Sequence, residues 1–482
     1  MTLRSTRLGS LAAACALGIS LVAVGQVPAH AAGTAIHDID GDGVADLAIG
    51  RPGFDNDAGA VELVLSRGTQ QLLTASDLGG TSEAGALFGL SVLVRDFDSD
   101  GFADIAIGAP HDVSSDHNGY AGQVFVVHGS ATGADLTRAS SLTTGEVDDQ
   151  FGWSLAALGS ASAPTALVVG APLYQGGDPT FGGGVIVHPI IAGVIEVGIE
   201  FTQNTAGVPG ASEDGDSFGY ALDASGQTLI VGAPYEAIGT ATAAGSVTLL
   251  NVATNGQTIS SSKSIHQNTT GIPESVSSND YFGASVAALG NLYAVGAPGE
   301  NIGTVVNTGL VQPFTYTAGG SVSAKPAIHQ NVTGVPGANE KNDYFGDSVD
   351  LIRPIAGGRA VIVGTPQENV GSVVDAGTAT VVRVDGTAFS AKLIQGGGSL
   401  PDSAEAYANT GLTVQQLTLR AGDSVDRVAV SSPGAAGGNG RVSVLAPLFT
   451  STENQYGPSV PDPDGNGDGF GFSVNKVTNP VK

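Results

Sequence analysis

The chain has 482 residues, of which 72 are glycine and only 13% are charged. Acidic residues outnumber basic ones by 45 to 18, which gives a formal net charge of −27. A chain this acidic repels a phosphate backbone, and this argues against a nucleic-acid partner. Apolar residues occur in short runs between clusters of Gly, Pro, Asn, Asp and Ser, a pattern that predicts many short strands joined by tight turns.

The N-terminal segment has a composition unlike the rest of the chain. Arg4 and Arg7 precede an apolar run over residues 8–24, and the Ala-His-Ala that ends at Ala31 fits a small-residue cleavage site. This pattern predicts a secretory signal peptide over residues 1–31. A retained membrane anchor is the alternative, but the run is close to the lower length limit for a membrane span. We therefore expect a secreted, extracellular protein with no transmembrane segment after cleavage.

Residues 32–482 are expected to form one domain. The only cysteine, Cys15, lies within the predicted signal peptide, so the secreted chain would contain no disulfide. Its stability would then come from its core, its turns and bound metal. The excess of acidic residues favours solubility and suits divalent cations.

Two short motifs alternate along this domain with a period in the sixties. The first is Phe-Gly, which begins at Phe88, Phe151, Phe218, Phe282, Phe345 and Phe470. The second is Gly-Ala-Pro or a looser copy of it, which ends at Pro52, Pro110, Pro172, Pro234, Pro298, Pro366 and Pro433. A fixed period of this length indicates one supersecondary unit stacked on copies of itself.

Each copy is expected to contain four strands. In the copy that begins at Phe88, strands are predicted at residues 88–92, 103–107, 122–128 and 135–142. Four antiparallel strands in each of seven copies predict an all-β fold, a seven-bladed β-propeller.

The two ends of the repeat array do not match. The copy that ends at Pro52 has no Phe-Gly before it, and the Phe-Gly at Phe470 has no Gly-Ala-Pro after it. The simplest explanation is that residues 470–474 supply the missing first strand of the first blade. We therefore expect this C-terminal strand to close the ring, because closure leaves no unpaired blade.

These motifs resemble the FG-GAP repeats of the N-terminal propeller of integrin alpha subunits, and the resemblance covers nearly all of residues 32–482. The segment from Thr202 to Gly219 is similar to secreted bacterial members of that family. Only the propeller is expected to carry over from the integrins. In integrins the face that carries the Gly-Ala-Pro loops meets partners, and this implies a binding role for the same face here.

Two loops carry a metal-binding pattern, with Asp at positions one, three, five and nine and Gly at position six. The position-seven carbonyl can add a further oxygen, and hard oxygen ligands in such a cage select Ca²⁺. The ligands expected are Asp38, Asp40, Asp42, Val44 and Asp46 in the first loop, and Asp96, Asp98, Asp100, Phe102 and Asp104 in the second. The resemblance agrees with two Ca²⁺ sites, since calcium in that family lies in the hairpin between the first two strands of a blade.

Three alternatives to this assignment were weighed. A solvated acidic turn would place four carboxylates together without a cation to offset their repulsion. An EF-hand would need Glu at position twelve, where this chain has Ile49 or Ile107. A third calcium loop counted from Asp464 would have Phe472 at its ninth position, so we interpret Asp468 there as an ordinary loop acid.

The sequence offers two further candidate sets of functional residues. Gly-x-Ser recurs after Phe, but the second Gly of an esterase elbow is absent each time, so the five serines are expected to be strand residues: Ser91, Ser154, Ser285, Ser348 and Ser473. Acids also recur in the loops of the expected binding face: Asp214, Glu236, Asp280, Glu300, Asp343 and Glu368. They either bind a partner or, as the repetition favours, hydrogen-bond their own turns.

The sequence therefore predicts a secreted, monomeric, calcium-binding propeller that acts as an adhesion-type module for a protein or a glycan. The alternative is a secreted hydrolase of the esterase or phospholipase type with its site on the propeller face. The resemblance allows this alternative, since FG-GAP propellers also accompany a phospholipase that acts on glycosylphosphatidylinositol anchors.

Overall fold

A computed structural model describes residues 37–112, 121–144, 148–160, 162–175, 180–353, 358–384, 391–394, 396–418, 426–445, 452–460, 462 and 470–474. The predicted signal peptide and the loop from Asp464 to Asp468 lie outside these residues and stay predictions. Among the described residues, no helix has both the length and the apolar character needed to cross a membrane.

Seven antiparallel sheets, called blades 1 to 7 in chain order, form the unit that spans residues 33–482. Blade 1 contains β1 (Leu47–Arg51), β2 (Ala60–Val64) and β3 (Gln70–Leu73). Blade 2 contains β4 (Ser91–Arg95), β5 (Asp104–Ala109), β6 (Gln123–Ser130) and β7 (Gly133–Leu142). Blade 3 contains β8 (Ser154–Ser160), β9 (Ala163–Ala171), β10 (Gly184–Ile191), β11 (Val194–Ile195) and β12 (Ile199–Phe201).

Blades 4 to 7 each contain four strands. Blade 4 contains β13 (Ala221–Ser225), β14 (Thr228–Ala233), β15 (Ser246–Val252) and β16 (Ile259–Ile265). Blade 5 contains β17 (Ser285–Leu289), β18 (Leu292–Ala297), β19 (Leu310–Tyr316) and β20 (Val322–Ala324). Blade 6 contains β21 (Ser348–Ile352), β22 (Ala360–Thr365), β23 (Thr378–Arg383) and β24 (Ala391–Ile394). Blade 7 contains β25 (Val414–Leu417), β26 (Arg427–Ser431), β27 (Val442–Leu445) and β28 (Thr452–Tyr456). One short helix, α1 (Phe54–Asp57), and two 3₁₀ turns, Ala75–Leu78 and Ala436–Gly438, lie in loops.

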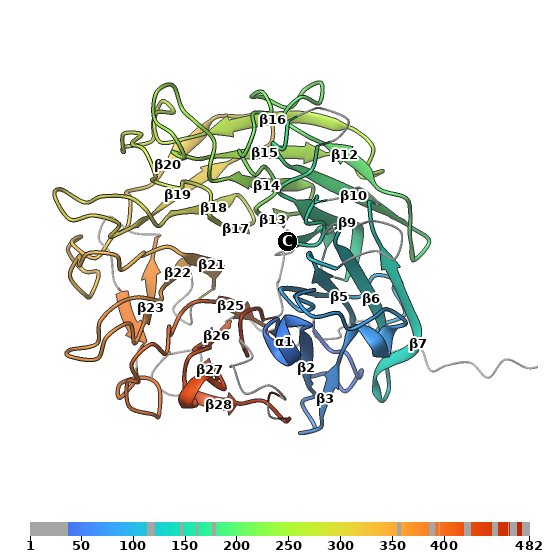
Figure 1. The fold of residues 1–482 in the computed structure, drawn as a ribbon. Helices are drawn as coiled ribbons and strands as arrows, with labels where there is room; N and C mark the ends of the chain where they lie inside the picture. Colours follow the sequence, from blue (N-terminus) through green and yellow to red (C-terminus); the bar gives the residue numbers. More distant parts are fainter. Residues whose placement is uncertain are drawn as a thin grey trace, which may run out of the picture. The chain divides into compact units, whose positions relative to one another are not determined.

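The blades follow one another around a common centre, and β13, β17, β21 and β25, the first strands of blades 4 to 7, lie nearest to it (Figure 1). The predicted seven-bladed propeller is therefore confirmed. Blade 3 differs from the expected four strands, because its outer strand is split into β11 and β12, which both pair with β10. The split occurs where the Glu196 carbonyl leaves the ladder and accepts a hydrogen bond from His188 Nδ1 at 3.0 Å.

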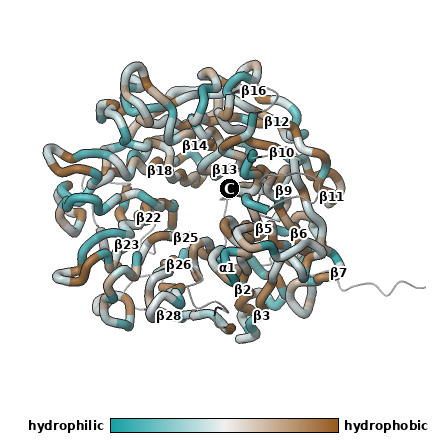
Figure 2. Tube along the Cα trace, viewed as in Figure 1, coloured by the Kyte–Doolittle hydropathy of each residue, from teal (hydrophilic) through white to brown (hydrophobic). Residues whose placement is uncertain are grey.

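The core lies between neighbouring blades. Every residue of β14 and β18 is buried, whereas the outer strand β16 is partly or fully exposed except at its last residue, Ile265. This difference explains the continuous apolar runs in the sequence, because a second strand has a blade packed on each of its faces. In Figure 2 hydrophobic stretches recur on the strands around the ring, and hydrophilic stretches recur in the loops.

The two repeated motifs meet at the contacts between blades. The Phe of every Phe-Gly is fully buried. A Cβ added to Gly108, in the Gly-Ala-Pro of blade 2, would lie 2.0 Å from the carbonyl oxygen of Gly152, in the Phe-Gly of blade 3. Only glycine fits so close an approach of two backbones, and this explains why both motifs carry it.

The recurrent serines tie each blade to the next one. Ser91 Oγ donates a hydrogen bond of 2.7 Å to the carbonyl of Gly152, and the other four serines make the same bond to a Phe-Gly or equivalent glycine of the next blade. The predicted strand position is confirmed for Ser91, Ser154, Ser285 and Ser348. Ser473 lies in a bend outside the named strands. Blade 4 has Ala221 at this position, and blade 7 has Thr413, which donates to the carbonyl of Phe472.

Residues 470–474 lie beside β1, at the place that the first strand occupies in the other blades. Gly50 N donates to the carbonyl of Ser473 at 2.8 Å, and Gly471 N donates to the carbonyl of Gly50 at 3.0 Å. Nearby, the fully buried Arg51 pairs with Glu62 at 3.1 Å and donates to the carbonyl of Val460 at 2.7 Å. The start and the end of the described chain are thus joined within blade 1.

Candidate functional site

The two predicted calcium loops have the same conformation. The second joins β4 to β5, and the first directly precedes β1. In each loop the carboxylates at positions one, three and five come together, with one oxygen from each lying within 4.8 Å of the others. These groups are Asp38, Asp40 and Asp42, and Asp96, Asp98 and Asp100.

Backbone amides fold each loop around its first carboxylate. Asp38 accepts hydrogen bonds from the N–H groups of Asp42 and Gly43 at 2.9 and 2.7 Å. Asp96 accepts the equivalent bonds from Asp100 and Gly101, both at 3.1 Å. The glycines have φ of 88° and 94°, a left-handed conformation that explains the Gly at position six.

The position-nine aspartates fasten the loops to their blades, and Asp104 also forms a second group with Asp98 and His128, whose ligand atoms lie within 4.8 Å of one another. Asp46 accepts hydrogen bonds from Ile39 N at 2.8 Å and from Ser66 N, in the hairpin between β2 and β3, at 2.7 Å. Asp104 does the same with Phe97 N at 2.7 Å and Gly129 N, in β6, at 3.0 Å.

At position seven, Val44 and Phe102 donate their N–H groups to Asp42 and Asp100 at 2.9 and 3.0 Å. These bonds continue the turn past the glycine. The carbonyl oxygens of the two residues, and the position-nine carboxylates, stay predicted as ligands.

Basic side chains from other strands lie against both loops. Arg67 Nε is 3.0 Å from Asp40 and 3.5 Å from Asp42, and Arg138, on β7, pairs with Asp98 and lies 3.2 Å from Asp100. His128 Nδ1, on β6, lies 3.2 Å from Asp98 and 3.1 Å from Asp104. The sequence analysis missed Arg67, Arg138 and His128, because only strand pairing brings them to the loops.

Several of the loop carboxylates resist ionisation, whereas at Asp42 burial is outweighed by the hydrogen bonds from Ser66 and Val44 N and by the charge of Arg67, which lower the pKa. Burial, and then the charge of Asp40, raise the pKa of Asp46 to about 7. Burial, and then the charge of Asp104, raise the pKa of Asp96 to about 7. A bound cation would offset both costs, because it neutralises the repulsion between the carboxylates and replaces their lost hydration.

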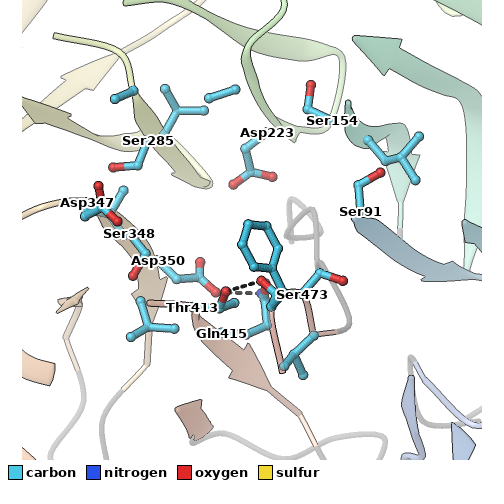
Figure 3. Close-up of a pocket in the computed structure, with 18 of the residues that line it drawn as sticks. Ser91, Ser154, Asp223, Ser285, Asp347, Ser348, Asp350, Thr413, Gln415 and Ser473 are labelled. Atoms are coloured by element: carbon cyan, nitrogen blue, oxygen red, sulfur yellow. Dashed lines mark hydrogen bonds between the residues drawn. The ribbon is translucent and has the colours of Figure 1, made fainter. Parts of the chain in front are cut away.

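A cavity of about 220 Å³ lies at the centre of the ring, between the first strands of the blades. Figure 3 shows serines from several of these strands around it, with Asp223 and Asp350 between them. Asp350 accepts a hydrogen bond from Gln415 Nε2 at 2.7 Å. The residues that directly follow Phe-Gly also line the cavity, and they include Trp153, Tyr220 and Asp347. This cavity therefore combines carboxylates with aromatic rings.

A row of four aromatic rings starts from this cavity. The ring centroids of Trp153 and Tyr220 are 5.5 Å apart, those of Tyr220 and Tyr235 are 6.1 Å apart, and those of Tyr235 and Tyr281 are 5.6 Å apart. Tyr235 follows a Gly-Ala-Pro directly and is 44% exposed. The loops that carry this row lie at the opposite ends of the strands from the Asp loops, because consecutive strands of a blade are antiparallel.

Some acidic residues of this face hydrogen-bond the backbone of their own turns, as the repetition in the sequence predicts. Asp216, Asp280 and Asp343 accept hydrogen bonds from the N–H of the residue three positions earlier, at 2.7, 2.6 and 2.6 Å. Glu236, Glu300 and Glu368 are different, because each accepts a hydrogen bond from a glutamine of the preceding blade. The sequence analysis did not predict these pairs.

Comparison with known proteins agrees with the repeat pattern. The FG-GAP repeat family model matches residues 31–61 and 88–127, which include both Asp loops. Integrin alpha-7 of Rattus norvegicus is 36% identical over 128 residues, which are 25% of this chain and 10% of that protein. Phosphatidylinositol-glycan-specific phospholipase D of Bos taurus is 33% identical over 156 residues, which are 29% of this chain and 18% of that protein.

The chain thus spans less than a fifth of the length of either relative. Among solved structures, Kuenenia stuttgartiensis hydrazine synthase aligns with a TM-score of 0.46 and 13% identity, over 86% of this chain and 94% of that one. The family match, with the seven blades and their repeated motifs, shows that this chain carries FG-GAP repeats on a propeller that is similar in sequence to integrin alpha subunits.

Proposed function

We propose that this protein is a secreted, monomeric, calcium-stabilised binding module. The observation that carries the calcium assignment is the identical arrangement of three carboxylates in two separate loops. Asp38, Asp40 and Asp42, with the corresponding residues of the second loop, would hold one Ca²⁺ in each. The ion would fix the loop and so stabilise the blade edge beneath it.

Binding of Ca²⁺ requires the two arginines to move away from the carboxylates that they now contact. Arg67 is half exposed and Arg138 is 44% exposed, so both side chains can turn into solvent. Isothermal titration of the EDTA-treated protein with Ca²⁺ tests the assignment. We expect two equivalents to bind at the loops, and loss of one when either Asp42 or Asp100 is replaced by Ala. Unchanged stoichiometry in both variants would contradict the assignment.

The partner would bind at the opposite face, on the aromatic row that runs from Trp153 to Tyr281. Aromatic faces stack on sugar rings, and neighbouring carboxylates accept hydrogen bonds from sugar hydroxyls, so the arrangement favours a glycan. A glycan array probed with the wild type and with Tyr235→Ala tests this. We expect binding that the substitution reduces at least tenfold. If the protein bound no glycan and captured one extracellular protein instead, the partner would be a protein and not a glycan.

A hydrolase is the second candidate, and the similarity to the Bos taurus phospholipase favours it. The geometry of the serines speaks against a nucleophile among them, because Ser91, Ser154 and their equivalents donate their hydroxyls to glycine carbonyls. A panel of ester and phosphodiester substrates, glycosylphosphatidylinositol-anchored protein included, decides between the two candidates. Turnover that persists through repurification would establish the hydrolase.

A further inference from the structure

Three clusters of oxygen atoms recur where neighbouring blades meet on the face opposite the Asp loops. Each contains a Gln from the end of one blade, an Asp that precedes the next Phe, and a Glu that follows the Gly-Ala-Pro of the next blade. We call them the joint clusters: Gln203, Asp216 and Glu236 between blades 3 and 4; Gln267, Asp280 and Glu300 between blades 4 and 5; Gln330, Asp343 and Glu368 between blades 5 and 6.

The contacts within the clusters are the same in all three copies. Each Gln donates a hydrogen bond from Nε2 to Oε2 of its Glu at 2.5 Å. In the middle cluster the loops also touch through their backbones, since Gly299 N donates to the carbonyl of Asp280 at 3.2 Å. The Asp and the Glu of each cluster are close enough for the charge of the Asp to raise the pKa of the Glu.

The side chains of these clusters are buried, except that of Glu236, which is partly exposed. In the middle cluster Gln267 is 1% exposed, Asp280 is fully buried and Glu300 is 6% exposed. Burial, with the charge of Asp280 adding to it, raises the pKa of Glu300 to about 8. Within the described part of the chain no lysine, arginine or histidine forms an ion pair with any carboxylate of the clusters.

Several buried oxygens of the clusters have no hydrogen-bond donor. The Gln Oε1 atom is buried and unpartnered in all three copies, and so is the Oδ1 atom of Asp280 and of Asp343. Each Gln Oε1 belongs to the planar amide whose nitrogen contacts the Glu, so it lies beside that carboxylate. Such atoms are costly to bury, because they have lost their water and gained nothing in exchange.

We propose that each joint cluster is a binding site for a hard divalent cation, with Ca²⁺ as the ion in the extracellular medium. Two carboxylates and an amide carbonyl are hard oxygen ligands, and their joint charge matches that of one divalent ion. One proton on the Glu would satisfy a single oxygen and leave the Gln and Asp oxygens unpartnered. A cation satisfies all of them at once, and it would link two blades at each joint. The sites do not depend on the Asp loops.

The test counts bound Ca²⁺ by equilibrium dialysis at about 1 mM free Ca²⁺, within the affinity range of extracellular sites. The starting variant is Asp42→Ala with Asp100→Ala, so that the Asp loops do not contribute. We expect it to retain one equivalent for each joint cluster. Adding Glu300→Gln should remove one equivalent, whereas Asp347→Asn, at a buried acid of the central cavity, should remove none. A folded loop variant that binds no Ca²⁺ would overturn the proposal.

A second measurement reports on the sites without relying on stability. Tyr281 directly follows Asp280, so Tb³⁺ in the middle cluster would be excited through this ring. In the loop variant we expect Tb³⁺ emission on tyrosine excitation, lost on addition of Ca²⁺ and weakened by Tyr281→Phe or by Glu300→Gln. Emission that Ca²⁺ does not displace, or that Glu300→Gln leaves unchanged, would contradict the proposal. Failure of the Asp loops alone would leave these results unaltered.

Discussion

The Asp loops and the joint clusters both gather carboxylates, but they compensate the negative charge differently. In the loops, the half-exposed side chains of Arg67 and Arg138 contact the carboxylates directly, and the carboxylates range from buried at Asp40 to partly exposed at Asp100. The joint clusters lie between blades, where glutamines are the partners and no base is paired with them in the described residues. A half-exposed arginine can be exchanged for an ion at little cost, whereas a buried cluster with no paired base needs a cation or a proton to be stable.

The two Asp loops are themselves not equivalent, and truncation should separate them. Removal of residues 470–482 takes away the strand beside β1, including the fully buried Phe470, whose loss alone should cost about 3–5 kcal/mol. We expect the unfolding free energy to fall by at least this much, with loss of Ca²⁺ binding at the first loop before the second. Calorimetry and Ca²⁺ titration measure both effects. A truncated chain that melts like the full one would exclude this account of blade 1.

Removal of calcium should destabilise the propeller. At a Ca²⁺ concentration 100 times Kd, each site contributes about 3 kcal/mol to the unfolding free energy. We expect EGTA to lower Tm by several degrees, and Asp42→Ala with Asp100→Ala to remove the part of this shift that comes from the loops. Any shift that remains in the double variant measures the joint clusters. Thermal scans with and without 1 mM CaCl₂ provide the comparison, and Tm values unaffected by EGTA would refute calcium stabilisation at both regions.

The joint clusters should make the calcium-free protein less stable as pH rises. The pKa of Glu300 is about 8 in the folded chain, against an ordinary value of 4.5, because burial and then the charge of Asp280 disfavour its ionised form. Between these two values the folded state binds more protons than the unfolded state, so the unfolding free energy falls with increasing pH. Across the whole of this pH range each such Glu changes the unfolding free energy by roughly 3–5 kcal/mol. We expect Tm in EGTA to decrease from pH 5 to pH 8.

Two variants make this pH experiment specific. Glu300→Gln should flatten the slope, because the amide does not ionise. Ca²⁺ should flatten it as well if the clusters bind the ion, since the bound cation favours the ionised carboxylates. A slope that Ca²⁺ leaves unchanged would mean that protons alone occupy the joints.

The arginines of the Asp loops should act as competitors of calcium. Arg67→Ala with Arg138→Ala removes a positive charge from each loop, and we expect Ca²⁺ to bind there about tenfold more tightly, or about 1.4 kcal/mol. Ca²⁺ titration at low ionic strength measures the change. Arg441→Ala, at a pair with Asp402 and Glu405 in blade 7, is the matched control and should not alter affinity. Weaker binding in the double variant would show that the arginines order the loops for the ion.

The smallest expected effect concerns the one blade contact that lacks a hydroxyl. Ala221 stands where five other blades have the serine that donates to a glycine carbonyl of the next blade. Ala221→Ser should restore this bond toward Gly283 and stabilise the protein by about 0.5–1 kcal/mol. Urea unfolding measures the difference. Destabilisation by the serine would show that blades 4 and 5 pack too closely for the hydroxyl.

Much of the fold could be predicted because short sequence motifs, Phe-Gly and Gly-Ala-Pro, mark each copy of the repeat. The Phe of Phe-Gly and the Gly of Gly-Ala-Pro mark the places where blades meet, so counting them gave seven blades and located the strand beside β1. The conformation of the Asp loops was equally predictable, since their hydrogen bonds span only four or five residues. The split outer strand of blade 3 was not predictable, because it depends on where Glu196 meets His188 across the sheet.

By itself, the sequence determined the repeated blade, the positions of the aspartates within each loop and the exclusion of a nucleophile elbow. The tertiary structure decided which distant side chains meet these groups. Arg138 reaches Asp98 only through the pairing of β5, β6 and β7, and Gln267 reaches Glu300 only because blade 5 follows blade 4 around the ring. Local spacing fixes turns and loops, whereas contacts between residues more than thirty positions apart arise only once the blades have packed.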